Sequence, residues 1–156
     1  MTFRQHVTIT TGLLLLVSFF WKNYLGLLLF WLGGIFIDVD HYLDYVKETG
    51  DTRISLRRLE DYFYNLKEQK FYCVFHSYEL IVLLLFINIF YLKHDYLYGL
   101  LAGLAMHIIL DALFNPVKIQ CYLFLYRLKH AFVFSEFLQQ KAGIQYLPTS
   151  NGLSED

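Results

Sequence analysis

Four long apolar segments dominate this chain and decide what it can fold into. They are Val7 to Trp21, Tyr24 to Ile37, Phe71 to Leu92 and Tyr96 to Phe114. At about 1.5 Å of rise per helical residue, the third and fourth reach across a hydrocarbon core of about 30 Å. The first and second reach that length only if their helices continue into polar flanks, to Phe3 and to Tyr45. Tight links between the segments pair them into two antiparallel hairpins, and this pattern predicts an all-α integral membrane bundle of about four apolar helices.

The composition supports the membrane class. Hydrophobic residues make up 56% of the chain and charged residues 17%, below the roughly 25% of a soluble domain. The formal net charge of -1 lacks the basic excess of a nucleic-acid binder, so no nucleic-acid partner is expected. No small-residue cleavage site follows the first apolar segment, which we therefore expect to be kept as a helix. Two cysteines, Cys73 and Cys121, make no disulfide framework and are interpreted as ordinary apolar-side residues.

Two further segments have mixed character and predict one or two amphipathic interfacial helices. Within Val46 to Lys70, apolar residues recur near helical spacing, and this pattern favours a helix on the membrane surface or capping the bundle. The apolar positions are Leu56, Leu59, Phe63 and Leu66. Val117 to Leu138 is a weaker candidate with poor periodicity, and the fourth apolar helix should end just before Pro116. We expect one domain over residues 1–140 and a weakly ordered tail over 141–156.

The basic residues predict an orientation in the membrane. With four spans, the N-terminus, the 46–70 segment and the C-terminal segment share one side. Every Lys and Arg except Lys22 and Lys93 falls on that side. By the positive-inside rule this side is cytoplasmic.

Histidine and acidic residues gather at the same end of the predicted bundle. They come from the start of the first helix, the end of the second, the start of the third and the end of the fourth. The residues are His6, Asp38, Asp40, His41, Asp44, His76, Glu79, His107 and Asp111. Segments far apart in sequence thus bring imidazole and carboxylate groups to the same depth in the membrane.

The spacing of these residues is typical of metal ligation. Three pairs lie three or four residues apart and so share a helix face: His107 with Asp111, His76 with Glu79, and Asp38 with His41. Imidazole nitrogen and carboxylate oxygen are ligands for zinc, manganese or iron. Buried carboxylates need a counter-charge, and Lys and Arg are nearly absent from these helices. A divalent transition metal, zinc or else manganese, is the simplest partner.

Ordinary roles compete with ligation at several positions. A single histidine at a helix end, such as His6, is more often an interfacial residue. Asp44 and Glu79 are equally well explained as solvated acids at helix ends. Function is favoured for His107 with Asp111, which lie inside an apolar helix, and for the run from Asp38 to His41.

The same residues resemble a known family, the YdjM-type inner-membrane metal-dependent hydrolases. The family order is a histidine near the N-terminus, a Gly-rich segment ending Pro-Asp-Ile-Asp-His, a His-Arg-Gly-x-Thr-His-Ser motif and a late His-x-x-x-Asp. The matching positions, which cover about the first 115 residues, are His6, Gly33 to His41, His76 with Ser77, and His107 with Asp111. The family is thought similar to zinc-dependent phospholipase C and P1-type nucleases, so the resemblance implies a helical fold that holds zinc for phosphoester hydrolysis.

Two departures from the family pattern matter. The Pro before the first Asp is Ile37, a change expected to affect only the turn. The first His and the Arg of the third motif fall on Phe71 and Tyr72. These two replacements imply either fewer bound metals than in the family or a fold that has lost catalysis.

Three hypotheses follow for function. The first is a metal-dependent hydrolase of a phosphoester, such as a membrane lipid, at the cytoplasmic face, with metal-activated water. Its ligands would be His6, Asp38, Asp40, His41, His76, His107 and Asp111, and its general base Asp40 or Glu79. The second is a non-enzymatic membrane protein whose cluster is structural or handles ions or protons. The third is a soluble helical domain with an unusually apolar core. The sequence leaves the substrate, the metal and the oligomeric state open.

Overall fold

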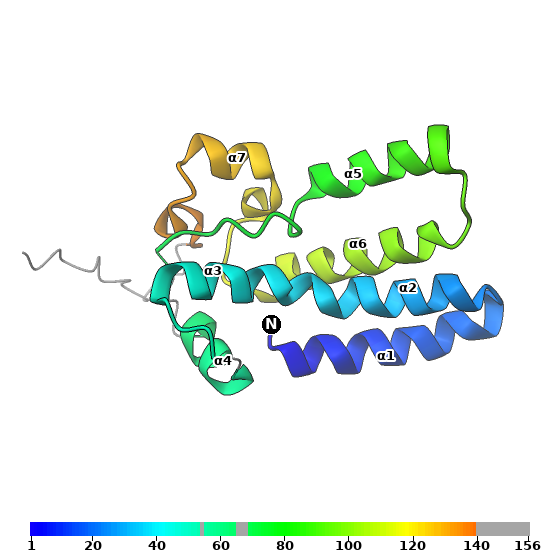
Figure 1. Ribbon diagram of the computed structural model, residues 1–156, viewed down its shortest axis with the longest axis horizontal. Helices are drawn as coiled ribbons and strands as arrows, with labels where there is room; N and C mark the ends of the chain where they lie inside the picture. The colour runs from blue at the N-terminus through cyan, green and yellow to red at the C-terminus, as the bar shows by residue number, and fades with distance from the viewer. Residues whose placement is uncertain (54, 65–68, 140–156) are drawn as a thin grey trace, which may run out of the picture.

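A computed structural model describes residues 1–53, 55–64 and 69–139, and within these ranges the chain is all-helical, as predicted (Figure 1). Two isolated bridges, Lys70 with Val133 and Val117 with Leu138, are the only extended pairings there. The elements in chain order are α1 Phe3–Phe20, α2 Tyr24–Ile35, η1 Phe36–Asp38, α3 Val39–Thr49, α4 Leu56–Tyr64, α5 Tyr78–Ile87, η2 Asn88–Leu92, α6 Leu97–Phe114, η3 Ile119–Tyr122, α7 Phe124–Lys129 and η4 Phe134–Phe137.

Helices α1 and α2 form the first hairpin, and polar caps define both of their starts. Thr2 and Gln5 make a reciprocal capping box at the start of α1, which satisfies backbone donors that the helix cannot pair itself. Asn23 accepts from the backbone N–H of Gly26 and so caps the start of α2 at Tyr24, shortly after α1 has ended at Phe20. The tight turn thus follows from a capping asparagine directly after the apolar run.

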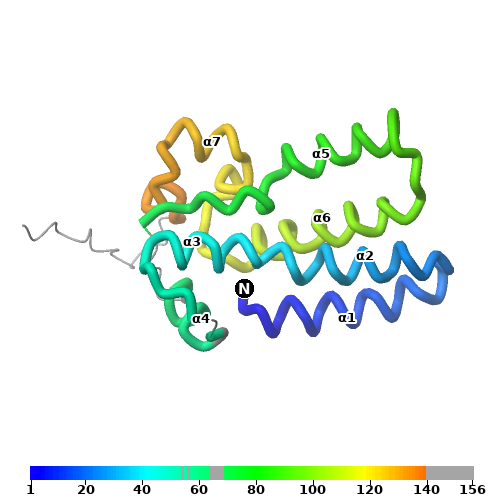
Figure 2. The backbone as a smooth tube through the Cα atoms, in the orientation of Figure 1, coloured from blue at the N-terminus to red at the C-terminus, as the bar shows by residue number. Residues whose placement is uncertain are grey.

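Glycines let α2 and α6 approach each other closely, and the two helices run side by side through the centre of the bundle (Figures 1 and 2). A Cβ atom added to Gly103 would collide with the carbonyl oxygen of Phe30, and one added to Gly99 would collide with that of Gly26. Small residues at such contacts are typical of helix pairs in membranes, where packing rather than water exclusion drives association. This contact fixes the position of the late helix that carries His107.

Three helical runs are long and apolar enough to cross a membrane: Phe3–Phe20, Tyr24–Thr49 and Leu97–Phe114. The expected extensions of the first two segments are confirmed, because α1 begins at Phe3 and α2 continues through η1 into α3 beyond Tyr45. The predicted end of the fourth helix is also confirmed. Helix α6 stops at Phe114, and Asn115 has an extended conformation before Pro116.

The third apolar segment was predicted to be long enough to cross, and this prediction is wrong. Its helix begins at Tyr78 rather than Phe71 and, with η2, ends at Leu92, so it is a shorter apolar helix. Residues 71–77 leave the helix because acidic side chains of α3 take their backbone donors: Asp44 accepts from Tyr72 and Cys73, and Asp40 accepts from Phe75. Side-chain acceptors have replaced the helical carbonyls.

The two amphipathic segments fold differently from each other. Helix α4 matches the first, and its Leu59 and Phe63 face a pocket at the end of the bundle, so α4 caps the bundle. Leu66 lies outside the described residues. The second, 117–138, is divided into η3, α7 and η4 instead of one helix. The expected tail over 141–156 also lies outside the described residues.

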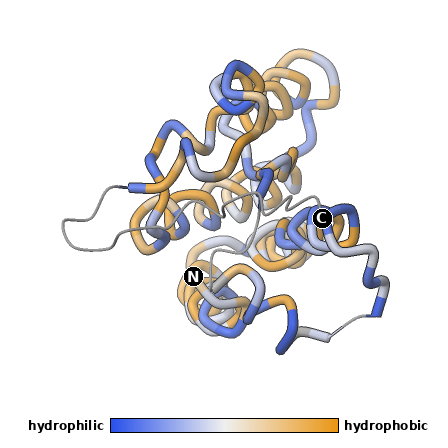
Figure 3. Tube along the Cα trace, turned by 90° about the vertical axis from the view of Figure 1, so that its left-hand side faces the viewer, coloured by the Kyte–Doolittle hydropathy of each residue, from blue (hydrophilic) through white to orange (hydrophobic). Residues whose placement is uncertain are grey.

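The hairpin turns and the polar cluster lie at opposite ends of the molecule. In Figure 1 the α1–α2 and α5–α6 turns are on the right, while the start of α1, the α2–α3 junction and the end of α6 meet near the middle of the view, at the other end of these long helices. Figure 3 views that end, where hydrophilic stretches mark connecting segments and short helices in front of mostly apolar long helices. The predicted convergence of four distant segments is therefore present in the fold.

The glycine contact gives a test of the packing. Gly103→Ala should destabilise the protein by about 1–3 kcal/mol, because the new methyl group must displace the backbone of α2. Thermal unfolding in detergent measures this change. Gly12→Ala is the matched control, since a Cβ there meets nothing within 4 Å, and it should be neutral or stabilise by up to about 1 kcal/mol. Equal effects of the two substitutions would contradict the close α2–α6 contact.

Candidate metal centre

Four histidine and aspartate side chains from three parts of the fold converge at the end of the bundle. Asp38 ends η1, His76 lies in the loop before α5, and His107 and Asp111 lie one turn apart on α6. We call these four residues the first group. One ligand atom of each lies within 4.8 Å of one ligand atom of every other, and all but Asp38 are buried.

The distances within the first group match a tetrahedral metal site. His76 Nε2 lies 3.2 Å from His107 Nε2, and 3.5 Å from both Asp38 Oδ1 and Asp111 Oδ2. His107 Nε2 lies 3.2 Å from Asp38 Oδ1 and 3.4 Å from Asp111 Oδ2. Ligands about 2.0–2.1 Å from a tetrahedral zinc ion are about 3.3–3.4 Å apart from one another. Five of the six edges of the tetrahedron thus have the length that a bound ion requires.

The hydrogen bonding of His107 points its free electron pair at the centre of the group. Its Nδ1 lies 2.9 Å from the carbonyl oxygen of Gly34, which can only accept, so Nδ1 carries the proton. In the neutral ring Nε2 is then an acceptor facing two carboxylates and the Nε2 of His76. Four acceptors around one point repel each other unless a cation or added protons lie between them. A backbone hydrogen bond that fixes the ring in this way is usual for metal-binding histidine.

His6 lies behind Asp111 rather than inside the first group. Its Nε2 is 2.9 Å from Asp111 Oδ1, whereas Asp111 Oδ2 faces the other ligands. The ring is fully buried and stacks on His107, with 3.8 Å between ring centroids. His6, a predicted ligand, therefore fixes the orientations of Asp111 and His107 in this structure.

Two acidic residues of α3 hold the loop that carries His76. Asp44 Oδ2 accepts from the backbone N–H groups of Tyr72 and Cys73 at 2.8 and 3.0 Å, and Asp40 Oδ2 accepts from Phe75 at 2.8 Å. Both carboxylates are buried. Asp40, a predicted ligand and base, and Asp44 thus fix the backbone around His76.

Arg127 holds the same loop from the opposite side, and the sequence assigned it no role. Its guanidinium donates to the carbonyl oxygens of Cys73 and His76 at 2.9 and 3.2 Å. The side chain is fully buried, and burial lowers the pKa of Arg127, although arginine stays protonated. Its only signal in the sequence is a single cation in the apolar stretch 121–128.

Cys73 belongs to a second group that shares His76. Asp40, His41, Cys73 and His76, which we call the second group, each offer a ligand atom within 4.8 Å of the others. Cys73 Sγ lies 3.3 Å from His41 Nδ1 and 3.3 Å from Asp44 Oδ2. The interpretation of this cysteine as an ordinary apolar-side residue did not foresee these polar contacts, since no pattern in the sequence joins Cys73 to α3.

His76 connects the two groups and is surrounded by carboxylates. Its Nε2 faces the first group, and its Nδ1 lies 3.0 Å from Asp40 Oδ1. Burial would lower the pKa of His76, but Asp40, Asp111 and Asp38 together raise it well above its ordinary value. In the absence of an ion, His76 therefore keeps a proton that a metal must displace.

The structure does not bring Glu79 into either group. Its carboxylate accepts from the backbone N–H groups of Phe124 and Leu125 at 2.9 and 3.1 Å, at the start of α7. Phe71, at the position of the family's first histidine, is buried, with its ring centroid 5.6 Å from that of His41. Tyr72, at the family's arginine position, lies under Lys47 Nζ, 3.5 Å from the ring centroid.

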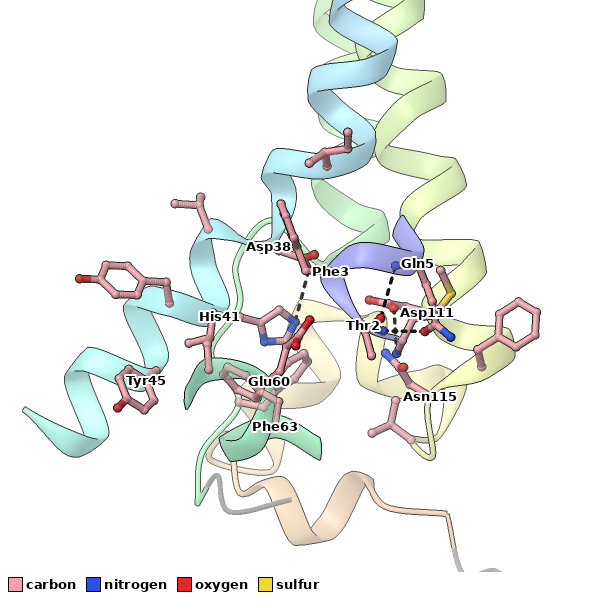
Figure 4. A pocket seen from close by; sticks show the side chains of 18 of the residues that line it. Thr2, Phe3, Gln5, Asp38, His41, Tyr45, Glu60, Phe63, Asp111 and Asn115 are labelled. Atoms are coloured by element: carbon pink, nitrogen blue, oxygen red, sulfur yellow. Dashed lines mark hydrogen bonds and ion pairs between the residues drawn. The ribbon is translucent and has the colours of Figure 1, made fainter. Parts of the chain in front are cut away.

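A pocket of about 990 Å³ is lined by the two carboxylates of the first group, Asp38 and Asp111. Figure 4 shows Asp38 and His41 on one side of it, Asp111 and Asn115 on the other, and Glu60 and Phe63 of α4 below. Its apolar wall includes Ile9, Ile35, Phe36, Leu59, Phe63, Phe71, Phe114, Val117 and Phe134. The pocket therefore joins acceptor groups for an ion to space for an apolar chain.

Comparison of the chain with protein-family models, with curated proteins and with solved structures finds no match in any of the three. The resemblance to the YdjM-type family therefore stays a prediction, carried by the motif residues alone. Groups that can hold a metal ion are present in the described residues.

Arg127 gives a first test of the centre. Arg127→Met keeps most of the side-chain volume but removes the donor to the His76 carbonyl and one of the two donors to the Cys73 carbonyl, which keeps the backbone N–H of His76, so it should destabilise the protein by about 1–3 kcal/mol. It should also weaken metal binding, because the loop carrying His76 loses its support. Thermal unfolding and metal content of the purified protein check both effects. Lys129→Met, at an exposed position of the same helix, should change stability by less than about 0.5 kcal/mol.

The proton on His76 gives a second test. Because its raised pKa keeps His76 protonated at higher pH than usual, metal binding should release protons, and affinity should rise with pH through the neutral range. Calorimetric titration of zinc in buffers of different ionisation enthalpy measures the number of protons released. Affinity independent of pH, with no proton release, would contradict ligation by His76.

Proposed function

We propose that this protein is a membrane-bound, metal-dependent hydrolase of phosphoesters carried by amphiphilic molecules such as lipids. The observation that carries the proposal is the tetrahedral first group at the base of a largely apolar pocket. The first group supports binding of zinc, with manganese as the alternative, because two imidazoles and two carboxylates suit both ions.

Helix length supports a membrane location with the centre near one surface. Fourteen residues separate His6 from Phe20 along α1, and the same number separate Asp111 from Leu97 along α6. At about 1.5 Å per residue, the ligands lie about 21 Å from the turns, against about 30 Å of hydrocarbon. The ligands would then lie about 9 Å inside the acyl–headgroup boundary on their own side of the membrane. The excess of basic residues at this end favours the cytoplasmic side of a cell inner membrane.

This depth favours an amphiphilic substrate. A phosphoester headgroup can reach Asp38 and Asp111, which line the pocket, while an acyl chain lies against Ile9, Phe36 or Phe114. Arg53 also lines the pocket, where its guanidinium can donate to a phosphate oxygen. A soluble phosphoester without an apolar chain would leave the apolar wall unused.

Each ligand residue has a defined task in the proposed reaction. When bound, a divalent ion lowers the pKa of water and stabilises charge on phosphoryl oxygens. His76 and His107 would hold the ion through Nε2, and Asp111 would hold it through Oδ2 while His6 contacts its Oδ1. Asp38 is the more exposed carboxylate, with 19% of its side chain accessible against 4% for Asp111. We therefore assign Asp38 to the fourth position of the tetrahedron only in the resting state. During the reaction the attacking water would take that position, and Asp38 would orient the water and accept its proton.

Asp38 thus replaces Asp40 and Glu79, the two residues that the sequence suggested as general base. Asp40 and Glu79 do not line the pocket, and their carboxylates hold the His76 loop and the start of α7. The motif resemblance supports the same reaction class. Aromatic residues at Phe71 and Tyr72 leave Arg53 as the pocket-lining candidate for the cationic role of the family's arginine.

Removal of one ligand charge tests the proposal. Asp111→Asn should lower zinc affinity and lipid phosphoester hydrolysis by more than about 100-fold, since loss of a ligand exceeds the effect of losing an outer-shell partner. Zinc content by mass spectrometry and release of the headgroup from mixed micelles measure the two effects. Asp95→Asn, an exposed aspartate in the turn at the far end, is the matched control and should change neither.

The substrate panel separates the hypotheses. Phosphomonoester and phosphodiester lipids in micelles are compared with water-soluble esters that lack acyl chains, and the lipids should be preferred. Stoichiometric zinc without hydrolysis of any member would favour the non-enzymatic alternative. A chain that folds but binds no transition metal at neutral pH without chelator would show that the hydrolase hypothesis is wrong.

A further inference from the structure

We propose that the second group is a second metal-binding position, in which Cys73 supplies a thiolate ligand to a zinc-type ion beside Asp40, His41 and His76. The position is distinct from the first group, although His76 belongs to both. Its existence does not depend on hydrolysis, and it adds a sulfur ligand to a centre otherwise built from imidazole and carboxylate.

The ligand distances support this position. His76 Nδ1 lies 3.0 Å from Asp40 Oδ1, and Cys73 Sγ lies 3.3 Å from His41 Nδ1. All four residues offer ligand atoms within 4.8 Å of one another. These separations fit ligands about 2.0–2.3 Å from a common ion. The two nitrogens of His76 face different groups, so its ring would bridge the two ions as an imidazolate, with both of its N–H protons released to solvent.

Two buried atoms in the second group lack the partners that burial normally requires. His76 Nδ1 and Asp40 Oδ1 are both inaccessible and neither has a hydrogen-bond partner among the described residues. They form a close ion-pair contact at 3.0 Å, but the atoms do not align as donor and acceptor. Buried polar atoms are nearly always paired, and an ion bound by both atoms would satisfy them together.

The fold also fixes Cys73 in a conformation that presents its sulfur to α3. Its φ angle is +24°, a conformation that side-chain-bearing residues rarely adopt. The backbone is held on both sides, by Asp44 at the N–H group and by Arg127 at the carbonyl oxygen. A strained residue held by surrounding interactions is typical of functional positions.

The charges of the second group suit a divalent ion of borderline softness. A thiolate and a carboxylate together supply two negative charges, and the imidazole of His41 adds a neutral nitrogen. On binding, the thiol proton of Cys73, which Asp44 Oδ2 now accepts in a hydrogen bond, leaves to solvent, and a metal–sulfur bond forms without any oxidation. Sulfur with imidazole selects zinc and cobalt over magnesium or calcium.

Cobalt titration of the full chain in detergent tests the second position. Chelator-treated protein should bind two equivalents of Co²⁺, with a thiolate-to-metal charge-transfer band in the near ultraviolet. Cys73→Ser should lose the band and one equivalent. Cys121→Ser is the matched control, because Cys121 is equally buried but belongs to neither group, and it should keep both. His107→Ala should lose one equivalent and keep the band.

Three results would overturn the second position. They are a single equivalent without the sulfur band in folded wild-type protein, a band that persists in Cys73→Ser, and a band lost in Cys121→Ser. The wild-type titration decides the question even if Cys73→Ser folds poorly, because the band reports sulfur ligation directly. Failure of the proposed hydrolase function is a different result, namely two bound equivalents without cleavage of any phosphoester in the panel.

Discussion

Carboxylates enclosed by apolar helices need a counter-charge. This requirement explains most of the contacts at the end of the bundle where the histidine and aspartate residues meet. Asp38, Asp40, Asp44 and Asp111 lie within one small region at the end of the bundle, and three of the four are buried. These carboxylates have two different kinds of partner. Asp44 and Asp40 accept backbone N–H groups of one loop, whereas Asp38 and Asp111 face the Nε2 atoms of His76 and His107. The hydrogen bonds from the loop reach one oxygen each of Asp44 and Asp40, while Asp40 Oδ1 has no hydrogen-bond partner among the described residues. An ion is the natural partner of that oxygen and of Asp38 and Asp111.

The conformation of the loop from Phe71 to Ser77 depends on the carboxylates that bind its backbone. Side chains of α3 take its backbone donors on one side, and Arg127 donates to its carbonyl groups on the other. The loop therefore cannot continue the helix that its apolar sequence favours, but it can place His76 between two groups of ligands. The same interactions fix Cys73 next to His41. A support made of charge-assisted hydrogen bonds gives the geometric precision that a metal ligand needs.

Much of the fold could be predicted from local pattern. The extents of α1 and of the α2–α3 run, and the end of α6 before Pro116, follow from apolar length and from the geometry that proline imposes on its neighbour. The convergence of His6, Asp38, His76, His107 and Asp111 follows from hairpin topology, because alternate helix ends share one side. The start of the third helix was predicted seven residues too early, at Phe71 instead of Tyr78. Hydropathy carries no information about the carboxylates of α3, which accept hydrogen bonds from the backbone N–H groups of residues 72, 73 and 75.

The sequence by itself determined that the chain is helical and that histidine and aspartate residues meet at one end, because length, hydropathy and i to i+4 spacing are local properties. Only the tertiary structure decided which of them form the first group and which support it. His6 holds Asp111, Asp40 and Asp44 hold a loop, and Glu79 holds α7. Cys73 and Arg127 acquired roles in the same way. Their contacts join residues more than 30 positions apart, and such pairings depend on packing between helices, which no local pattern encodes.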